Sequence, residues 1–484
     1  MGAIERVGLW NGPNWHTAAW MAIALVLSGL GLGLVVFRQR FDWALQLGQI
    51  PALPLMAGSM LAGAVFLLLL PLLRAGAGFE GASGRRLLGF IVGVGLILRL
   101  LMFATEPALE DDQQRYLWEG ALAAHGISPY RVSPADAQAA DRGTLLGKIA
   151  DQAGPVLERI NNAKLKTIYP PVAEAAFALA YRIKPFSLNA WRLVLLVADC
   201  GTLWLLLILL REIGRPAPWV ALYWWNPIVV KEVFNSGHME GVLMLFVVAA
   251  VVLAARQRFI LASSALGLAA GVKIWPVLLA PLLLRPLLDR PKALVVPLAV
   301  LGTICALCAW PIVAGGLDER SGFVAYAQRW QANGALLPGL RGLIGLFGMP
   351  YEWAGRLARA LLMMSAGLTA LWLACRPIEG TADLLSRAAL AALAIVLTSP
   401  AQFPWYAIWT LPFLPFAPRL GVLAMAVMLP IYYASFYFSA IDAYPVFRDR
   451  IVWLIWIPVW GLLALEAWPW KRRPPPIPAE PGGR

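Results

Sequence analysis

Apolar runs separated by short polar segments follow one another along almost the whole chain. A helix that crosses a bilayer needs about 20 apolar residues, somewhat fewer where protein surrounds it, so these runs predict about 14 spans. The predicted spans are residues 17–36, 52–74, 87–104, 190–210, 217–233, 240–255, 259–272, 274–290, 293–314, 352–375, 386–400, 404–418, 420–438 and 451–470. Because the shorter runs are ambiguous, we expect an all-α polytopic integral membrane protein with about 12–14 transmembrane helices.

Two long hydrophilic segments, roughly 105–167 and 316–350, interrupt this pattern. The apolar segment 168–183, which follows the first of them, is short and carries Glu174 and Arg182. A crossing there would place the first long loop and the later NSGHMEG turn on opposite sides of the membrane. We therefore expect segment 168–183 to be an interfacial helix that lies on the membrane.

Basic side chains indicate the orientation of the bundle. The chain has 40 Lys and Arg against 27 Asp and Glu, a net charge of +13. Most bases flank predicted spans on one side, and the positive-inside rule makes that side cytoplasmic together with the N-terminus. These bases are Arg85, Arg86, Arg211, Arg215, Arg256, Arg258, Arg285, Arg290, Lys292, Arg376, Arg387, Arg419 and Lys471–Arg473. Arg38 and Arg40 fall on the other side, so the first two spans fit the rule least well.

Composition changes the list of possible functions. Of all residues, 60% are hydrophobic and 14% charged, whereas soluble proteins average about 25% charged, which excludes an ordinary cytosolic enzyme. The four cysteines lie in or beside apolar runs, which argues against a disulfide framework or a thiolate metal site. The basic balance is explained by cytoplasmic loops, so we expect no nucleic-acid partner.

Five carboxylates follow the third predicted span and are expected close to the bilayer surface, and they are Glu106, Glu110, Asp111, Asp112 and Glu119. Crowded carboxylates raise one another's pKa unless a cation such as Arg115 compensates. A carboxylate placed there can act as a general base toward a hydroxyl, or bind a divalent ion. The alternative is that these acids only solvate a loop and cap a helix.

The run from Asp111 to Gly120, DDQQRYLWEG, is followed by GISPY at 126–130. Together they resemble the first extracytoplasmic loop of GT-C glycosyltransferases, polytopic enzymes that use polyprenyl-phosphate sugars. The resemblance is closest to bacterial mannosyltransferases related to the catalytic subunit of GPI mannosyltransferase. Glu119 stands where that family more often has Asp.

Further matches run in the same order as in the family. They are Tyr169-Pro-Pro, the segment from Asn226-Pro227 to His238, the Lys-x-x-Pro segment at Lys273, and Ser399-Pro400 through Trp405-Tyr406. Ser236 is inserted between the Asn and Gly of the family's Asn-Gly-His turn, and Glu240 stands where Asp is usual. The acidic loop with Asp111 and Asp112 therefore follows the family's pattern more closely than this turn does.

The resemblance implies an inverting transfer in which an acceptor hydroxyl attacks the anomeric carbon of a polyprenyl-phosphate hexose, with mannose expected. It implies that Asp111, or its close rival Asp112, is the catalytic base. The expected substrate-binding residues are Arg115, Tyr116, Glu119, Tyr130, Tyr169, Glu232, Asn235, His238, Glu240, Lys273 and Tyr406. The implied partners are that donor, a glycolipid or glycan acceptor and membrane lipid, in a bacterial inner membrane with the active site extracytoplasmic. We assign no metal ligand, although a divalent cation is compatible with the carboxylates.

Several of these residues have a second interpretation. Lys273 is the expected partner of the donor phosphate, but a lysine in an apolar run also snorkels to the interface. Arg329 and Arg341 are reserve candidates. His238 fits a metal ligand, a substrate hydrogen bond or a structural contact, and the spacing around it is not a recognised zinc pattern. Two further charges within spans, Arg99 and Asp199, are either functional or paired with each other.

The resemblance divides the chain into four regions. Residues 1–86 are N-terminal transmembrane helices, and 87–255 form a GT-C-like catalytic core with the acidic loop. Residues 256–470 are C-terminal transmembrane helices, and 471–484 are a Pro-rich cytoplasmic tail that we expect to be disordered.

Two other classes of protein share the polytopic pattern. A transporter or flippase also has about a dozen spans, but such proteins show repeats and broken helices in matching halves, which we do not find by eye. A lipid-linked oligosaccharide ligase is the other alternative, and it should carry Arg-rich external loops in place of a paired-acid motif.

Overall fold

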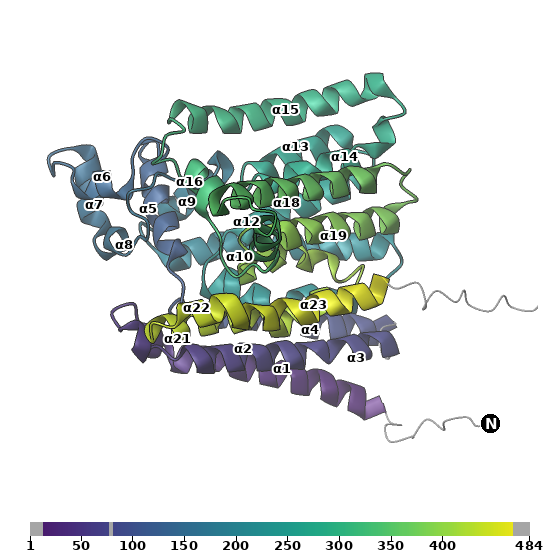
Figure 1. Cartoon of the computed structure of the whole chain (residues 1–484). Helices are drawn as coiled ribbons and strands as arrows, with labels where there is room; N and C mark the ends of the chain where they lie inside the picture. Colours follow the sequence, from purple (N-terminus) through teal and green to yellow (C-terminus); the bar gives the residue numbers. More distant parts are fainter. Residues whose placement is uncertain (1–12, 77–80, 468–484) are drawn as a thin grey trace, which may run out of the picture.

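The computed structural model describes residues 13–76 and 81–467, so the tail at 471–484 and the bases Lys471–Arg473 lie outside the described residues. Within the described ranges the chain forms helices and turns but no β-strand, and one isolated bridge joins Ala332 to Ala401. The long helices lie side by side in one bundle, and the short helices α5 to α8 gather at one end of it (Figure 1). The prediction of an all-α polytopic membrane protein is confirmed.

Eight helical segments in the described residues are long and apolar enough to cross a bilayer. They are α1 (Pro13–Val36), α2 with α3 (Ala52–Leu67 and Leu69–Ala75), α10 (Leu188–Glu212), α15 (Pro291–Ala314), α18 (Tyr351–Ala374), α19 (Thr381–Thr398), α20 with α21 (Leu420–Met428 and Ala434–Ala440) and α22 with α23 (Tyr444–Val446 and Val452–Ala467). The bundle also contains α4 (Gly81–Met102) and the shorter apolar helices α12 (Glu240–Ala255) and α13 (Phe259–Ala270).

Three predicted spans, 217–233, 274–290 and 404–418, are not single helices. Each is a chain of short pieces, which are η3 (Ala217–Val220), α11 (Ala221–Trp224), η4 (Val229–Asn235), η5 (Trp275–Leu279), α14 (Ala280–Leu283), η6 (Arg285–Leu287), η7 (Pro404–Trp409) and η8 (Leu411–Phe413). Prolines in all three segments remove backbone donors and break the helical ladder. Irregular backbone of this kind is tolerated at membrane depth because protein surrounds it. The bundle therefore has fewer continuous spans than the hydropathy predicts.

The expected interfacial helix is α9 (Pro171–Ile183), which packs along α5 (Asp112–Ala124). Gly120 allows this close approach, because a Cβ atom there would lie 2.5 Å from the carbonyl oxygen of Phe177. The ring of Tyr116 stacks on the ring of the same Phe177, with 4.7 Å between the ring centroids. This packing positions the first turn of α5, where the paired acids lie.

A buried ion pair fixes α4 against α10. Arg99 Nε lies 2.6 Å from Asp199 Oδ2, and both side chains are 0% exposed. Arg99 also donates to the carbonyl oxygens of Gly95 (2.9 Å) and Trp224 (2.7 Å), and Tyr223 donates its hydroxyl to Asp199. Of the two interpretations of these intramembrane charges, the structure therefore shows the pairing.

The two ends of the bundle differ in chemistry. At the basic end, Arg256 pairs with Glu212 at 2.5 Å, and the backbone of Leu420 donates to Glu466 at 2.6 Å. At the other end, the segment after α1 approaches the acidic loop, and Trp43 lines the same cavity as Asp111. Arg38 and Arg40 belong to η1 (Arg38–Phe41), the short helix just before Trp43.

Candidate active site

A cavity of about 1030 Å³ lies between the acidic loop and the C-terminal half of the bundle. Asp111 and Asp112 line it from the start of α5, and Lys273 and Tyr406 line it from segments more than a hundred residues later. The cavity therefore brings together residues from four of the predicted motifs, since Tyr169 lines it as well.

Asp111 occupies the N-cap position of α5, with φ −134° and ψ −5°. Its Oδ1 accepts a hydrogen bond of 2.7 Å from the side chain of Asn161. Burial, followed by repulsion from Glu110, raises the pKa of Asp111 to about 6, although the Asn161 hydrogen bond opposes the rise. Burial also raises the pKa of Asp112, whereas His238 lowers it. Both acids thus lie beside the cavity with a proton affinity above that of an exposed carboxylate.

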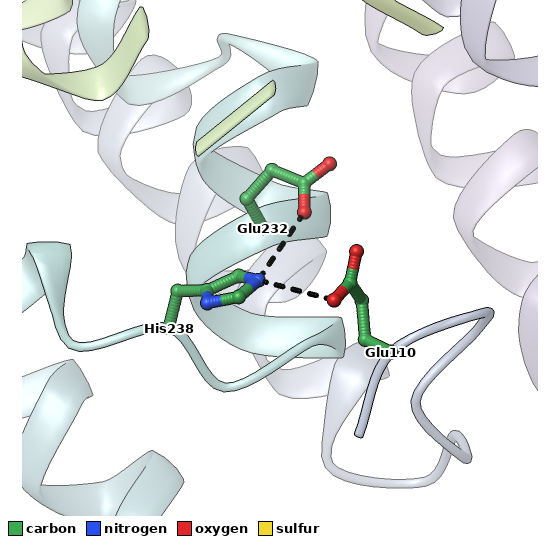
Figure 2. A group of neighbouring side chains, drawn as sticks. All are labelled: Glu110, Glu232 and His238. Carbon is green, nitrogen blue, oxygen red and sulfur yellow. Dashed lines mark ion pairs between the residues drawn. The ribbon is translucent and has the colours of Figure 1, made fainter. Parts of the chain in front are cut away.

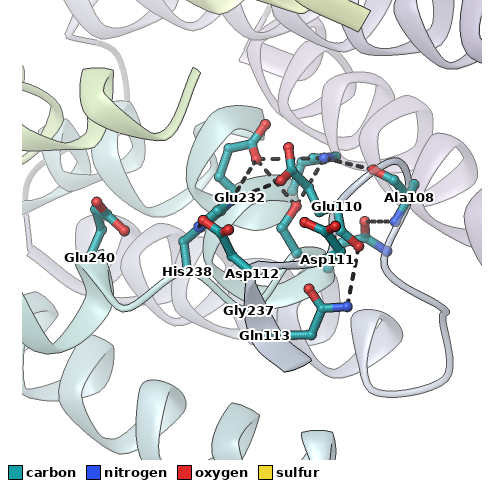
Figure 3. Close-up of polar contacts among 12 residues, drawn as sticks. Ala108, Glu110, Asp111, Asp112, Gln113, Glu232, Gly237, His238 and Glu240 are labelled. Carbon is teal, nitrogen blue, oxygen red and sulfur yellow. Dashed lines mark hydrogen bonds and ion pairs between the residues drawn. The ribbon is translucent and has the colours of Figure 1, made fainter. Parts of the chain in front are cut away.

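Behind the paired acids, two glutamates converge on His238 (Figure 2). His238 Nε2 lies 3.6 Å from Glu110 Oε2 and 3.9 Å from Glu232 Oε2. On the other side of the ring, Nδ1 lies 3.4 Å from the hydroxyl of Tyr116 and 4.0 Å from Asp112 Oδ2. The imidazole therefore stands between a glutamate pair and one of the candidate bases, and these side chains point toward one another in Figure 3.

The turn that carries His238 is held by Asn235. The Asn235 amide donates to Thr105 Oγ1 at 2.8 Å, and its oxygen accepts from the backbone of Ala108 at 2.9 Å. Gly237 follows with φ +83°, a left-handed conformation that favours glycine. These contacts fix the turn after η4 to the segment between α4 and α5, so Asn235 positions His238 opposite the acids.

Aromatic rings stack on one face of the His238 imidazole. Trp405 lies parallel to the imidazole with 3.9 Å between ring centroids, and Phe403 stacks on Trp405 at 4.3 Å. Trp405 and Tyr406 belong to the late Pro-Trp-Tyr motif, which the sequence analysis matched to the family. Only Tyr406 was named as a site residue there, because nothing in the sequence places an indole against a particular histidine.

Lys231 is a site residue that the sequence analysis missed. Its ammonium donates to the carbonyl oxygen of Ala108 (3.0 Å) and to Ser236 Oγ (2.9 Å), and it lies 3.5 Å from Glu232 Oε2. Glu232 also accepts a hydrogen bond from the hydroxyl of Tyr433. The same rule that singled out Lys273 applies to Lys231, because both lysines lie in apolar runs of the sequence.

Lys273 lies inside the protein. Its ammonium pairs with Glu240, whose side chain is fully buried. It also lies over the rings of Tyr406 and Trp409, at 4.7 and 5.4 Å from their centroids. The Tyr406 hydroxyl is 2.7 Å from that of Tyr326. Lys273 and Tyr406 are thus part of one buried cluster beside the cavity, and Glu240 lies apart from the glutamate pair (Figure 3).

Arg115 and Glu119 of α5 form a buried ion pair, with 3.1 Å between Arg115 Nη1 and Glu119 Oε1. Arg115 also donates to the carbonyl oxygen of Asn161 at 2.9 Å, and Asn161 in turn donates to Asp111. Glu119 accepts a hydrogen bond of 2.9 Å from Thr167. This network positions Asp111 through Asn161.

Two predicted tyrosines lie on the same side of the cavity. The Tyr130 hydroxyl donates to the carbonyl oxygen of Tyr169 at 2.9 Å. The Tyr169 ring meets that of Tyr116 edge to face, with 5.1 Å between centroids. Tyr116 and Tyr169 line the cavity, whereas Tyr130 supports the backbone beneath them.

The reserve arginines lie elsewhere. Arg329 donates to the carbonyl oxygen of Glu319 at 3.4 Å, and Arg341 lies 4.2 Å from the centroid of the Tyr351 ring. Neither of them lines the cavity, but Arg359 of α18 does, with one nitrogen donating to the carbonyl oxygen of Trp330 at 2.9 Å. Arg359 lies in a predicted span, so the rule for intramembrane charges would have found it.

A second cavity of about 520 Å³ lies between the N-terminal helices and the glutamate pair. Its walls are mainly apolar side chains of α1 and α2, and Lys231, Glu232 and Tyr433 close one end. In the described part of the chain, Glu110, Glu232 and His238 also have ligand atoms that all lie within 4.8 Å of one another, so they are the residues able to hold a metal ion.

Residues 167–400 match the family model of glycosyltransferase family 87, a GT-C-type family. The matched region includes His238 and Lys273, and the paired acids Asp111 and Asp112 lie before it. Comparison with curated proteins and with solved structures finds no match. The family match supports a GT-C glycosyltransferase.

Proposed function

We propose that this glycosyltransferase moves a hexose, with mannose as the expected sugar, from a polyprenyl phosphate to a hydroxyl of a glycolipid or glycan, with inversion. The observation that carries the proposal is the position of Asp111 and Asp112. Both line a cavity of about 1030 Å³ at the start of a helix, with the cations and aromatic rings of the other motifs around it. The resemblance of the acidic loop to mannosyltransferases of this type supports the choice of sugar.

The proposed chemistry needs one base. A polyprenyl phosphate leaves as a weakly basic anion, so the acceptor hydroxyl alone requires proton removal. Direct attack on the anomeric carbon inverts its configuration, in contrast to a retaining hydrolase that uses a second carboxylate as nucleophile. A pKa of about 6 leaves Asp111 ionised at neutral pH, with more proton affinity than a surface aspartate. We therefore favour Asp111 as the base, with Asp112 as its close rival.

Cations and aromatic side chains around the cavity suit the donor. Arg359 and Lys273 are basic groups within reach of a phosphate that enters it. Trp330, Tyr406 and Trp409 offer flat apolar surfaces to a sugar ring or an isoprenoid chain. The second, apolar cavity between α1 and α2 suits the lipid chain of a substrate, because a hydrocarbon chain has a lower free energy in apolar surroundings than in water.

Charge asymmetry supports an extracytoplasmic site. The positive-inside rule places the basic end, with Arg256 and Arg215, in the cytoplasm. The acidic loop is then on the opposite face, where a polyprenyl-phosphate sugar is reached from the membrane without a soluble nucleotide-binding domain. We propose the bacterial inner membrane as the location.

Transfer of radiolabelled mannose from synthetic polyprenyl-phosphate mannose tests the proposal, in membranes that contain wild type, Asp111→Asn or Asp112→Asn. Loss of a general base costs about 10²–10⁴-fold in rate, so we expect Asp111→Asn to abolish detectable labelling. Asp151→Asn is the matched control, because Asp151 is 56% exposed and pairs with Arg142 away from the cavity. It should retain wild-type transfer.

The outcomes separate the parts of the proposal. Labelled product that disappears with Asp112→Asn and persists with Asp111→Asn would reverse the choice of base. Transfer only from a glucose or arabinose donor would change the proposed sugar, but the proposed type of reaction would stand. No transfer from any donor across a broad panel of acceptors would favour the transporter or ligase class. A product with the donor's anomeric configuration, determined by NMR, would contradict inversion.

A further inference from the structure

The side chains of Glu110, Glu232 and His238 are buried together, and two of them have a polar atom without a hydrogen-bond partner. Their exposed fractions are 6%, 3% and 1%. Among the described residues, His238 Nε2 and Glu110 Oε1 have no hydrogen-bond partner. Buried polar atoms in native proteins nearly always have a partner, because leaving one unpaired costs free energy. The imidazole nitrogen that faces both glutamates therefore points to a missing ligand.

The distances within this group fit a shared ion better than hydrogen bonds. Separations of 3.6 Å to Glu110 and 3.9 Å to Glu232 are too long for hydrogen bonds from His238 Nε2. Two ligand atoms at about 2.1 Å from a tetrahedral metal ion lie about 3.4 Å apart. Small side-chain rotations would bring all three atoms to that spacing.

The local charge is also unbalanced. Glu110, Glu232 and Asp112 face His238, while Lys231 supplies one positive charge beside Glu232. With the carboxylates ionised, the group carries a net charge of about −2, and burial makes such repulsion costly. One divalent cation would neutralise it.

The surroundings also orient the three groups as a metal site requires. Metal-bound histidines commonly use their second ring nitrogen to contact a carboxylate or another hydrogen-bonding group. His238 Nδ1 meets this condition through the hydroxyl of Tyr116 at 3.4 Å, and Asp112 Oδ2 lies further away at 4.0 Å. The parallel Trp405 ring at 3.9 Å restricts rotation of the imidazole.

Glu232 and Glu110 are oriented and reachable. The hydroxyl of Tyr433 donates to Glu232 Oε1, and Ser236 Oγ donates to Oε2 at 3.2 Å, so Oε2 is held 3.9 Å from His238 Nε2. Glu110 lines the cavity of about 1030 Å³, and Glu232 lines the cavity of about 520 Å³. The group lies between the two cavities, so an ion has an entry path.

We propose that Glu110, Glu232 and His238 bind one divalent transition-metal ion, Mn²⁺ or Zn²⁺. Two carboxylates and one imidazole form a mixed hard and borderline ligand set, which these ions accept more readily than Ca²⁺ or Mg²⁺. The ion neutralises the carboxylates behind Asp112 and makes entry of a second anion, such as a phosphate, less costly. That role rests on the proposed function, but the binding itself does not, because it is measured without turnover.

Metal binding to the full chain, purified in detergent and stripped with a chelator, tests the proposal. Mn²⁺ is titrated by electron paramagnetic resonance, and Zn²⁺ by competition with an indicator. We expect one ion per chain in the wild type, and affinity weakened by more than about tenfold in Glu110→Gln and His238→Gln. His125→Gln is the matched control, since His125 bonds to the carbonyl oxygen of Ala121 at the end of α5 and should keep wild-type affinity.

Two results would overturn the proposal. One is folded wild-type protein that binds neither ion, which would show that the group shares protons instead. The other is binding with unchanged stoichiometry and affinity in the folded His238→Gln variant, which would place the ion elsewhere. If that variant aggregates, Glu232→Gln takes its place, and the metal-dependent rise in melting temperature is compared with that of His125→Gln. Metal binding without glycosyl transfer would leave this site standing and remove only the proposed function.

Discussion

Single buried charges fix the geometry of this bundle, and Arg99 with Asp199 is the clearest case. Both side chains are fully buried, and three different segments, α4, α10 and α11, contribute to the pair and its partners. A buried pair of this kind does not by itself add much stability, but either member alone is costly. The pair therefore specifies how α4, α10 and the segment around Trp224 meet.

Removing one member of the pair should destabilise the protein strongly. We expect Asp199→Ala to lower the free energy of unfolding by about 3–5 kcal/mol, because Arg99 keeps its charge in an apolar interior. Asp151→Ala breaks the exposed pair with Arg142 and should cost about 0–1 kcal/mol. Unfolding titrations in mixed detergent micelles measure both values. A loss for Asp199→Ala as small as that for Asp151→Ala would mean that the pair does not anchor the bundle.

At the scale of elements, close contact between segments depends on particular glycines. On α4, a Cβ atom at Gly95 would lie 2.1 Å from the buried Trp224 ring, whereas a Cβ at Gly93 meets nothing within 4 Å. The two positions lie on the same helix and differ in what they face. Alanine substitutions at these two positions therefore distinguish the effect of close packing from the effect of the low helix propensity of glycine.

The paired substitutions Gly95→Ala and Gly93→Ala should act in opposite directions. We expect Gly95→Ala to cost about 1–3 kcal/mol, because Trp224 has no room to retreat. Gly93→Ala should be neutral or stabilise by up to about 1 kcal/mol, because alanine favours a helix. Thermal unfolding in detergent compares the two variants with wild type. Equal melting temperatures for both would refute the close packing of α4 on Trp224.

At the scale of the whole molecule, the acidic motif before α5 lies at one end of the described bundle, which we call the acidic end, and Arg256 follows α12 at the other end. By the positive-inside rule, this distribution predicts the orientation of the bundle in a membrane. Lys148 is exposed in α7 (Leu145–Ala153), within the acidic loop, and Cys375 is exposed at the end of α18. If the acidic end is extracytoplasmic, the two positions lie on opposite sides of the bilayer.

Cysteine labelling in intact cells checks this orientation. One variant carries Lys148→Cys with the four native cysteines replaced by alanine, and the other retains Cys375 alone. We expect a membrane-impermeant maleimide to label Lys148→Cys in intact cells with a permeabilised outer membrane, and to label Cys375 only after lysis. The reverse pattern would place the proposed active site in the cytoplasm and contradict the positive-inside assignment.

The sequence alone predicted those features that depend on local chemistry. Long apolar runs predict buried or membrane-spanning segments wherever they occur, and the regular structure in the described residues is helical, without strands. The rule that an intramembrane charge needs a partner or a function singled out Arg99 and Asp199, and the structure shows them paired with each other. It also singled out Lys273, but the sequence did not predict its pairing with Glu240. The motif resemblance selected Asp111 and Asp112, and both do line the large cavity.

Tertiary structure decided the rest, because distance between residues far apart in the chain is set by packing. Hydropathy measures how apolar a segment is, so it could not show that 217–233 is a chain of short helices wrapped in protein. Glu110 and His238 are separated by 128 positions, and only the packing of the segment between α4 and α5 against the turn after η4 brings them within 3.6 Å. Which side chains share the centre of the site depends on this packing, and no local pattern encodes it.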